Sequence, residues 1–184
     1  MKYAYYMKRG IRLIRLLCLK LTSGSNIHFV SRLRSFNVSC DTAFSIENGG
    51  KMTLGSFSTH TNVHLSVCGG SLEIGNGCSF NRNDIIVSMQ NIHIGDGSIF
   101  GPNVCIYDHD HVFNKTGIIK GKYKSSRIYI GKNVWIGAGV TILRGSTIGD
   151  NSIVGAGCVI NGEIPTNTLV TMENRNLHFS ALHD

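Results

Sequence analysis

The spacing of apolar residues changes once along the chain, near residue 40, and this change separates two kinds of predicted structure. Before it, residues 3–21 carry apolar side chains at helical spacing, with basic side chains on another face. This pattern predicts an N-terminal helix that caps one end of the core. The apolar positions of this helix are Ile11, Ile14, Leu17 and Leu21.

Beyond residue 40, an aliphatic or aromatic residue returns at every sixth position over long stretches. Neither a helix nor an alternating strand has this period, whereas a hexapeptide β-helix does. Each hexapeptide forms a short strand and a corner, and three of them make one triangular coil of about 18 residues. The in-phase side chain points to the axis, and a glycine after it leaves room at the corner. The in-phase residues are Ile74, Phe80, Ile86, Ile94, Phe100, Ile106, Ile130, Ile136, Ile142, Ile148, Val154 and Ile160.

The six-residue rhythm stops after Ile106 and resumes at Ile130. The segment between them, residues 108–127, is rich in lysine and is predicted to be a loop extruded from one corner. The prediction is therefore an all-β fold, a parallel β-helix (a hexapeptide-repeat solenoid) with an N-terminal helix and an extruded loop. Its parts are a basic helix and lead-in over 1–40, the β-helix domain with its loop over 41–170, and a C-terminal tail over 171–184.

The net charge of +7 is concentrated at the N-terminus. Residues 1–40 hold eight basic residues and no acidic one, while residues 41–184 hold ten basic and eleven acidic residues. A nucleic-acid-binding protein carries its basic surface on the body of the fold, so no nucleic-acid partner is expected. The N-terminal helix has a second interpretation, in which it lies on an anionic membrane surface.

The N-terminus does not have the pattern of a secretory signal peptide. Its longest uncharged apolar run, residues 16–19, is too short for the apolar region of such a peptide. We therefore expect a cytoplasmic protein, which the second interpretation of the helix would place peripherally at the inner face of the membrane. The six cysteines form no C-x-x-C pair, so they are predicted to be buried free thiols and not ligands of a structural zinc ion.

The repeats, above all residues 133–160 (NVWIGAGVTILRGSTIGDNSIVGAGCVI), resemble the left-handed β-helix hexapeptide acyltransferases, with the maltose and capsule sugar O-acetyltransferases most similar. The resemblance covers about residues 45–175. It implies a left-handed coil, a homotrimer with active sites between subunits, and acetyl-CoA as the acyl donor, with no metal required. The function it implies is O-acetylation of a sugar hydroxyl on a surface polysaccharide or its glycan precursor.

The resemblance places the catalytic histidine at the start of the extruded loop, in the segment IYDHDH of residues 106–111. The family histidine falls on His111, but His109 is two residues away and would share its face in an extended chain. A neutral imidazole there can take the proton of the attacking hydroxyl. Asp108 and Asp110 are both candidates for the carboxylate that orients the ring, and the sequence leaves the choice between them and between the histidines open.

The remaining site residues also follow from the resemblance. Gly137 and Gly155 match positions where the pantetheine arm of CoA touches the backbone, Trp135 would wall the acetyl site, and Arg175 would lie near the nucleotide. The tail departs from the family, because its G-N-P-A-[KR] pattern reads Met172-Glu173-Asn174-Arg175 here. Asn83 and Asp108 are candidates on the side of the carbohydrate acceptor.

Three other functions compete with sugar O-acetylation. The first is N-acetylation of an amino sugar by the same fold, and the second is a non-catalytic β-helix scaffold. The third is a zinc-dependent carbonic anhydrase of the same fold, which needs a histidine pair five positions apart. The loop pair His109 and His111 has a different spacing, and His60 and His64 precede the loop.

Overall fold

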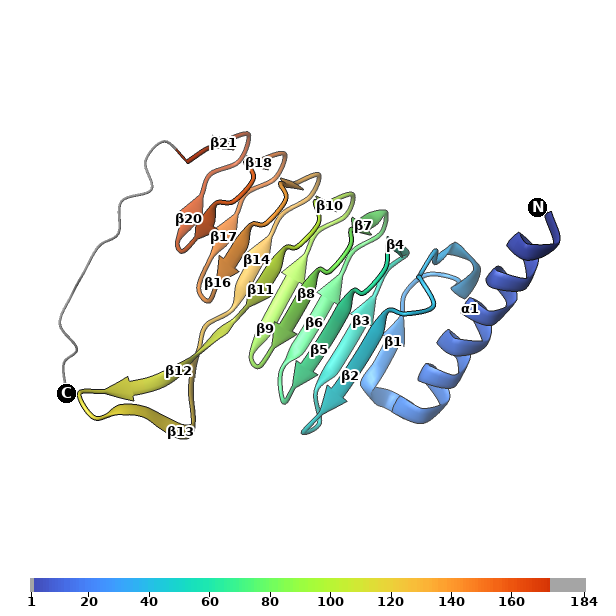
Figure 1. Ribbon diagram of the computed structural model, residues 1–184, viewed down its shortest axis with the longest axis horizontal. Coiled ribbons are helices and arrows are strands. Elements are labelled where there is room, and N and C mark those ends of the chain that lie inside the picture. The colour runs from blue at the N-terminus through green and yellow to red at the C-terminus, as the bar shows by residue number, and fades with distance from the viewer. Residues whose placement is uncertain (1, 173–184) are drawn as a thin grey trace.

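The computed structural model describes residues 2–172, with the side chains of residues 10, 11, 13–33 and 35–172. Helix α1 (Lys2–Ser23) lies at one end of a long stack of short strands, and a two-stranded arm projects from the stack farther along the chain (Figure 1). The predicted parallel β-helix with an N-terminal helix is confirmed. No helix in the described part of the chain is long and apolar enough to cross a membrane.

The stack consists of three parallel sheets that the chain visits in turn, one strand of each per coil. Sheet 1 contains β1 (Ile27–Phe29), β3 (Lys51–Leu54), β6 (Ser71–Ile74), β9 (Asn91–Ile94), β14 (Ile128–Ile130), β17 (Thr147–Ile148) and β20 (Glu163–Ile164). Sheet 2 contains β4 (Phe57–Thr59), β7 (Cys78–Phe80), β10 (Ile99–Phe100), β15 (Trp135–Ile136), β18 (Ile153–Val154) and β21 (Leu169–Val170). Sheet 3 contains β2 (Ala43–Glu47), β5 (His64–Cys68), β8 (Ile85–Ser88), β11 (Cys105–Tyr107), β16 (Thr141–Leu143) and β19 (Val159–Ile160).

The in-phase apolar residues form columns along the axis of the stack. In sheet 1, Ile94 pairs in register with Ile74 on one side and with Ile130 on the other, and all three are buried. In sheet 2, the rings of Phe80 and Phe100 stack with their centroids 4.8 Å apart. Because every coil adds one member to each column, the core is continuous and its stability comes from contacts between neighbouring coils.

The chain turns its corners in two ways, and the use of glycine was the one predicted from the sequence. At glycine corners the next coil passes so close that a side chain has no room: a Cβ on Gly95 would lie 2.6 Å from the backbone of Gly131. Several other corners place asparagine in the left-handed region, which asparagine tolerates better than most residues. Within the described residues every non-glycine residue with positive φ is an asparagine, at positions 48, 62, 83, 103, 133, 151 and 167.

Helix α1 closes the end of the core, as predicted. Leu16 is buried and Leu19 is partly buried against the first coil, where the short 3-10 helices η1 (Gly24–Asn26) and η2 (Leu33–Ser35) lead into the stack. The Arg15 guanidinium donates a hydrogen bond to the Thr42 carbonyl at 3.1 Å. The helix thus covers apolar side chains of the first coil that would otherwise face water.

Candidate active site

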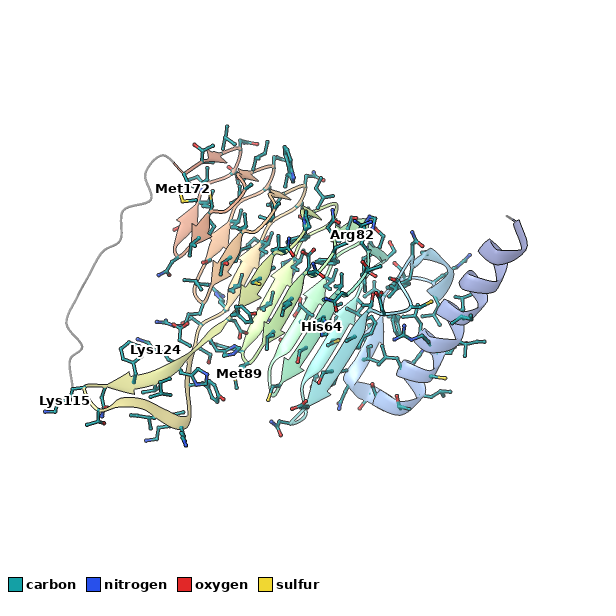
Figure 2. All side chains as sticks on the ribbon, in the orientation of Figure 1. His64, Arg82, Met89, Lys115, Lys124 and Met172 are labelled. Atoms are coloured by element: carbon teal, nitrogen blue, oxygen red, sulfur yellow. The ribbon has the colours of Figure 1, made fainter. Side chains whose placement is uncertain are left out.

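The segment predicted as an extruded loop is an antiparallel hairpin. Strands β12 (His109–Asn114) and β13 (Gly117–Ser125) pair, with His109 opposite Ser125 and His111 opposite Tyr123. The hairpin leaves after β11 of sheet 3 and returns to β14 of sheet 1, so it projects from the edge where these two sheets meet (Figure 1). Figure 2 shows Lys115 and Lys124 on the hairpin and Met89 near its base.

Asp108 anchors the base of the hairpin to the neighbouring coil. Its carboxylate is fully buried and accepts hydrogen bonds from the Met89 N–H at 2.7 Å, the Gln90 N–H at 2.8 Å and the Ser88 hydroxyl at 2.8 Å. Backbone donors of this kind compensate the cost of burying a carboxylate. Contact of Asp108 with an acceptor stays a prediction, and within this chain its carboxylate is engaged by these three donors.

The same carboxylate orients His109. The Nδ1 atom of His109 lies 3.3 Å from Oδ1 of Asp108, and an ionised carboxylate only accepts. In the neutral ring the proton therefore sits on Nδ1, which leaves Nε2 free to accept a proton. The ring is mostly buried and lies edge-on to Tyr107 and to Tyr123, with centroid distances of 6.2 Å and 5.8 Å.

His111 lies on the same face of β12 as His109, and this shared face was predicted. Its ring lies against that of Tyr123, with the centroids 4.8 Å apart, and the residue is exposed. Among the described residues no hydrogen bond to the His111 ring is formed. Asp110 points to the other face and pairs with Arg144, which follows β16. Of the two candidate orienting carboxylates, Asp108 therefore contacts a histidine and Asp110 does not.

Tyr107 completes the aromatic surroundings of the two histidines. Burial raises the pKa of the Tyr107 hydroxyl above its ordinary value, and the neighbouring Cys105 raises it further. The phenol therefore stays protonated at neutral pH and remains a hydrogen-bond donor at the base of the hairpin. Two tyrosines, two imidazoles and one buried carboxylate thus converge where the repeat is interrupted.

The residues expected to contact CoA lie elsewhere on the same chain. Trp135 is half exposed on the outer face of sheet 2, the one sheet that does not meet at the edge carrying the hairpin. Gly137 and Gly155 are corner residues whose N–H groups donate to the Val154 and Val170 carbonyls of the next coil. Arg175 lies outside the described residues. A single chain therefore does not bring Trp135 next to the histidines.

Asn83 belongs to a ladder of corner asparagines. Its side-chain oxygen accepts from the Asn62 amide at 2.9 Å, and its own amide donates to Asn103 at 3.0 Å. Both functional ends of the carboxamide are therefore engaged within the chain. Contact with an acceptor stays a prediction. The signal that the sequence analysis missed is the recurrence of asparagine at the coil spacing, as in Asn133 and Asn151.

Within the described part of the chain, no three histidine, cysteine, aspartate or glutamate side chains gather as a metal site requires. The six cysteines are free thiols, but only Cys78 and Cys158 are buried. Cys68 and Cys105 are partly exposed. Cys18 and Cys40 are exposed, so the expectation that the cysteines are buried is correct for two of them and wrong for these last two.

A comparison with protein-family models identifies the repeat. The model described as bacterial transferase hexapeptide (six repeats) matches residues 127–162. Residues 127–162 of this chain are therefore similar to that hexapeptide-repeat family. The match begins where β14 returns from the hairpin and ends shortly before β20, so it covers the most regular coils of the stack.

Solved structures extend the likeness to most of the length of this chain. A maltose O-acetyltransferase from Clostridium difficile is 28% identical with a TM-score of 0.51, over 85% of this chain and 81% of that chain. AntD, an N-acyltransferase from Bacillus cereus, was solved with dTDP-4-amino-4,6-dideoxyglucose and coenzyme A. It is 16% identical with a TM-score of 0.66, over 81% of this chain and 80% of that chain. At this identity the likeness to AntD concerns the fold.

These matches confirm the predicted resemblance to hexapeptide-repeat acyltransferases and support an enzyme of the acyltransferase class. No curated protein matches the chain.

Proposed function

We propose that this hexapeptide-repeat protein transfers an acetyl group from acetyl-CoA to a carbohydrate hydroxyl, with His111 as the general base. The observation that carries the proposal is the hairpin base, where two imidazoles share one face and a buried carboxylate holds one of them. The 28% identical neighbour, a maltose O-acetyltransferase, supports a sugar hydroxyl as the acceptor.

The reaction requires one general base and close positioning of the sugar hydroxyl against the thioester. A sugar hydroxyl is a poor nucleophile at neutral pH, and His111 would take its proton as the oxygen attacks the thioester carbonyl. The new C–O bond forms, the C–S bond breaks, and the CoA thiolate leaves with the proton that the imidazolium returns. His109, held through Nδ1 by Asp108, would be a positioning residue that presents Nε2 to the substrate.

The site would be completed by a second copy of the chain. The hairpin and Trp135 lie on opposite sides of one solenoid, so a site that uses both needs a neighbouring subunit. The family resemblance supports a homotrimer with such shared sites. In that assembly Trp135 would wall the acetyl group, backbone atoms at Gly137 and Gly155 would line the pantetheine arm, and Arg175 would approach the nucleotide.

The acceptor we propose is a surface polysaccharide or its glycan precursor, modified in the cytoplasm. A second candidate, N-acylation of an amino sugar, is kept because AntD combines this fold with a bound amino-sugar nucleotide and coenzyme A. The two reactions give products of different stability, because hydroxylamine cleaves an acetyl ester and leaves an amide intact.

The test is a thiol-release assay with acetyl-CoA and a panel of sugars, amino sugars and glycan fragments. We expect acceptor-dependent CoA release that falls by about 10²–10⁴-fold in His111→Ala, the usual contribution of a general base. The His109→Ala variant should lose less. The matched control is His28→Ala, an exposed histidine of β1 at the other end of the stack, which should keep full activity.

Three results would overturn the proposal in whole or in part. Full turnover in His111→Ala would remove the histidine from the reaction. Failure of the wild-type protein to bind CoA, measured by calorimetry, would favour a scaffold without catalysis. An acetylated product that resists hydroxylamine would replace O-acetylation by N-acetylation.

A further inference from the structure

Helix α1 has two apolar sides, and the solenoid covers only one of them. Leu16 is buried against the first coil. On the other side lies an exposed stripe that extends over three turns of the helix. Its exposed fractions are 45% for Ile11, 61% for Ile14, 47% for Leu17 and 81% for Leu21. Four large apolar side chains in one row on a water-exposed surface indicate a contact surface.

A groove adjoins this stripe between α1 and the first coil. It has a volume of about 280 Å³, and Ile14 belongs both to its lining and to the stripe. The other lining residues are mostly apolar: Arg15, Leu16, Cys18, Leu19, Thr22, Val38, Ser39 and Phe44. The exposed stripe therefore continues into an apolar recess that an acyl chain can enter.

The charge of the N-terminal segment indicates which kind of surface fits the stripe. Residues 1–40 carry eight basic residues and no acidic one, against a net charge of −1 for residues 41–184. An apolar helix face accompanied by basic side chains favours the boundary between lipid headgroups and acyl chains, and each basic residue near an anionic leaflet adds to the attraction.

We propose that α1 docks this protein on an anionic lipid surface, with the stripe in the headgroup boundary and the adjoining groove receiving the end of an acyl chain. A second copy of the chain fits this surface less well, because two helices that carry basic residues and no acid repel one another. The proposal concerns binding alone and holds whichever acceptor the enzyme uses.

The test measures sedimentation of the full chain with vesicles of phosphatidylcholine, alone or mixed with phosphatidylglycerol. We expect binding to the mixed vesicles, little binding to the neutral ones, and weaker binding as salt is raised. The combined variant Ile14→Gln/Leu17→Gln/Leu21→Gln should bind at least about tenfold more weakly, because burial of these side chains supplies the apolar attraction. Glutamine keeps the helix propensity nearly unchanged.

Val159→Gln is the matched control, because Val159 is 63% exposed on β19 at the other end of the stack. It should bind vesicles as the wild type does, and circular dichroism should show both variants folded. Equal binding of the triple variant and the wild type to mixed vesicles would overturn the proposal. A second result would also overturn it: the wild type does not bind the vesicles, and light scattering gives a larger particle mass for the wild type than for the triple variant. The stripe would then join copies of the chain. Thiol release by either variant is measured separately, so failure of docking and failure of the proposed reaction give different results.

Discussion

At the scale of single residues, two buried carboxylates hold successive corners together and differ in what they do for the site. Asp84 accepts hydrogen bonds from the backbone N–H groups of Asn81 at 2.7 Å and Val104 at 2.9 Å. Asp108 accepts from three groups of the preceding corner and also from His109. Asp84 therefore stabilises its corner, whereas Asp108 stabilises its corner and also contacts the imidazole of His109.

Replacing Asp108 by asparagine should destabilise the protein by about 2–3 kcal/mol, because the amide group would face the Gln90 or Met89 N–H and leave that donor unpaired. We also expect kcat to fall with little change in KM, since the ring of His109 loses its fixed orientation. Urea unfolding and steady-state kinetics measure the two effects. Asp96→Asn is the control: Asp96 is exposed and accepts from the Asn76 N–H at 2.7 Å, so its loss should cost under about 1 kcal/mol. Equal effects in the two variants would contradict the anchoring role.

Asp84 predicts a pH dependence of stability. Burial raises the pKa of its carboxyl from 3.8 to about 6, although the Val104 and Asn81 N–H groups act in the opposite direction. Between about pH 4 and 6 the folded chain therefore binds more protons than the unfolded chain. The contribution of Asp84 to the free energy of unfolding is full below about pH 4 and is lost as the pH rises through about 6. The loss is on the order of 3 kcal/mol.

This dependence is measured as the difference in unfolding free energy between the wild type and Asp84→Asn from about pH 4 to 7. The difference should change in favour of the variant as the pH rises, because the amide does not ionise. A difference that stays constant across this range would contradict a raised pKa of Asp84.

The cysteines should react with alkylating reagents in the order of their exposure. Burial raises the pKa of the Cys78 thiol to about 11 from 9.0, which lowers its thiolate fraction about a hundredfold. Cys18 and Cys40 are exposed. Peptide mass spectrometry of the native protein should show iodoacetamide on these two first and on Cys78 only after unfolding. Early labelling of Cys78 would show that the core opens at this coil.

At the scale of elements, the asparagine corners join each coil to the next. Asn62, Asn83 and Asn103 hold the left-handed conformation and join their side chains in a ladder, and Asn133 and Asn151 begin a second one. Each ladder bond ties one coil to the next where the strands end. The asparagines thus serve two functions at once, the turn of the backbone and the contact between coils.

The ladder predicts how Asn83 responds to substitution. Asn83→Gly keeps the positive φ and removes two ladder bonds, so we expect a loss of stability of about 1–2 kcal/mol. Asn151→Gly, in the second ladder, is the matched control and should lose a similar amount. Steady-state kinetics distinguish the two roles of Asn83. A rise in KM for the acceptor in Asn83→Gly alone would support acceptor binding, whereas the same KM in both variants would assign Asn83 to the ladder only.

At the scale of the whole molecule, the arrangement of the three sheets separates the parts of the proposed site. The hairpin leaves the edge between sheets 3 and 1, and Trp135 lies on sheet 2 across the axis. Helix α1 closes the end of the stack that precedes the hairpin and carries its own exposed stripe (Figure 1). Catalysis, assembly and lipid docking would therefore occupy different surfaces of one solenoid.

This separation predicts complementation between two inactive variants. His111→Ala and Trp135→Ala are each expected to lose most activity alone. If each site combines the hairpin of one copy with Trp135 of the next, randomly mixed oligomers of the two should recover about a quarter of the wild-type sites. Unfolding and refolding the purified variants together, followed by the thiol-release assay, measures the recovery. Activity no greater than the sum of the separate variants would place both residues in a site within one chain.

Sequence periodicity was sufficient for the fold because a six-residue step is a local property that every coil repeats. The aliphatic columns, the end-capping helix and the place of the insertion all follow from spacing along the chain. His109 and His111 could also be paired in advance, since residues two apart in a strand share a face.

The solenoid, its interruption and the candidate imidazoles could therefore be predicted from the sequence, because these features depend on neighbours in the chain. Which carboxylate contacts a histidine depends on the folded chain and could not be predicted. Asp108 and Asp110 each lie one position from His109 in the chain, but Asp108 faces donors from another coil and Asp110 faces Arg144. The position of Trp135 opposite the hairpin also depends on the folded chain, because it follows from how the three sheets enclose the axis. Contacts between coils join residues that lie a whole coil apart along the chain, and a local pattern does not specify them.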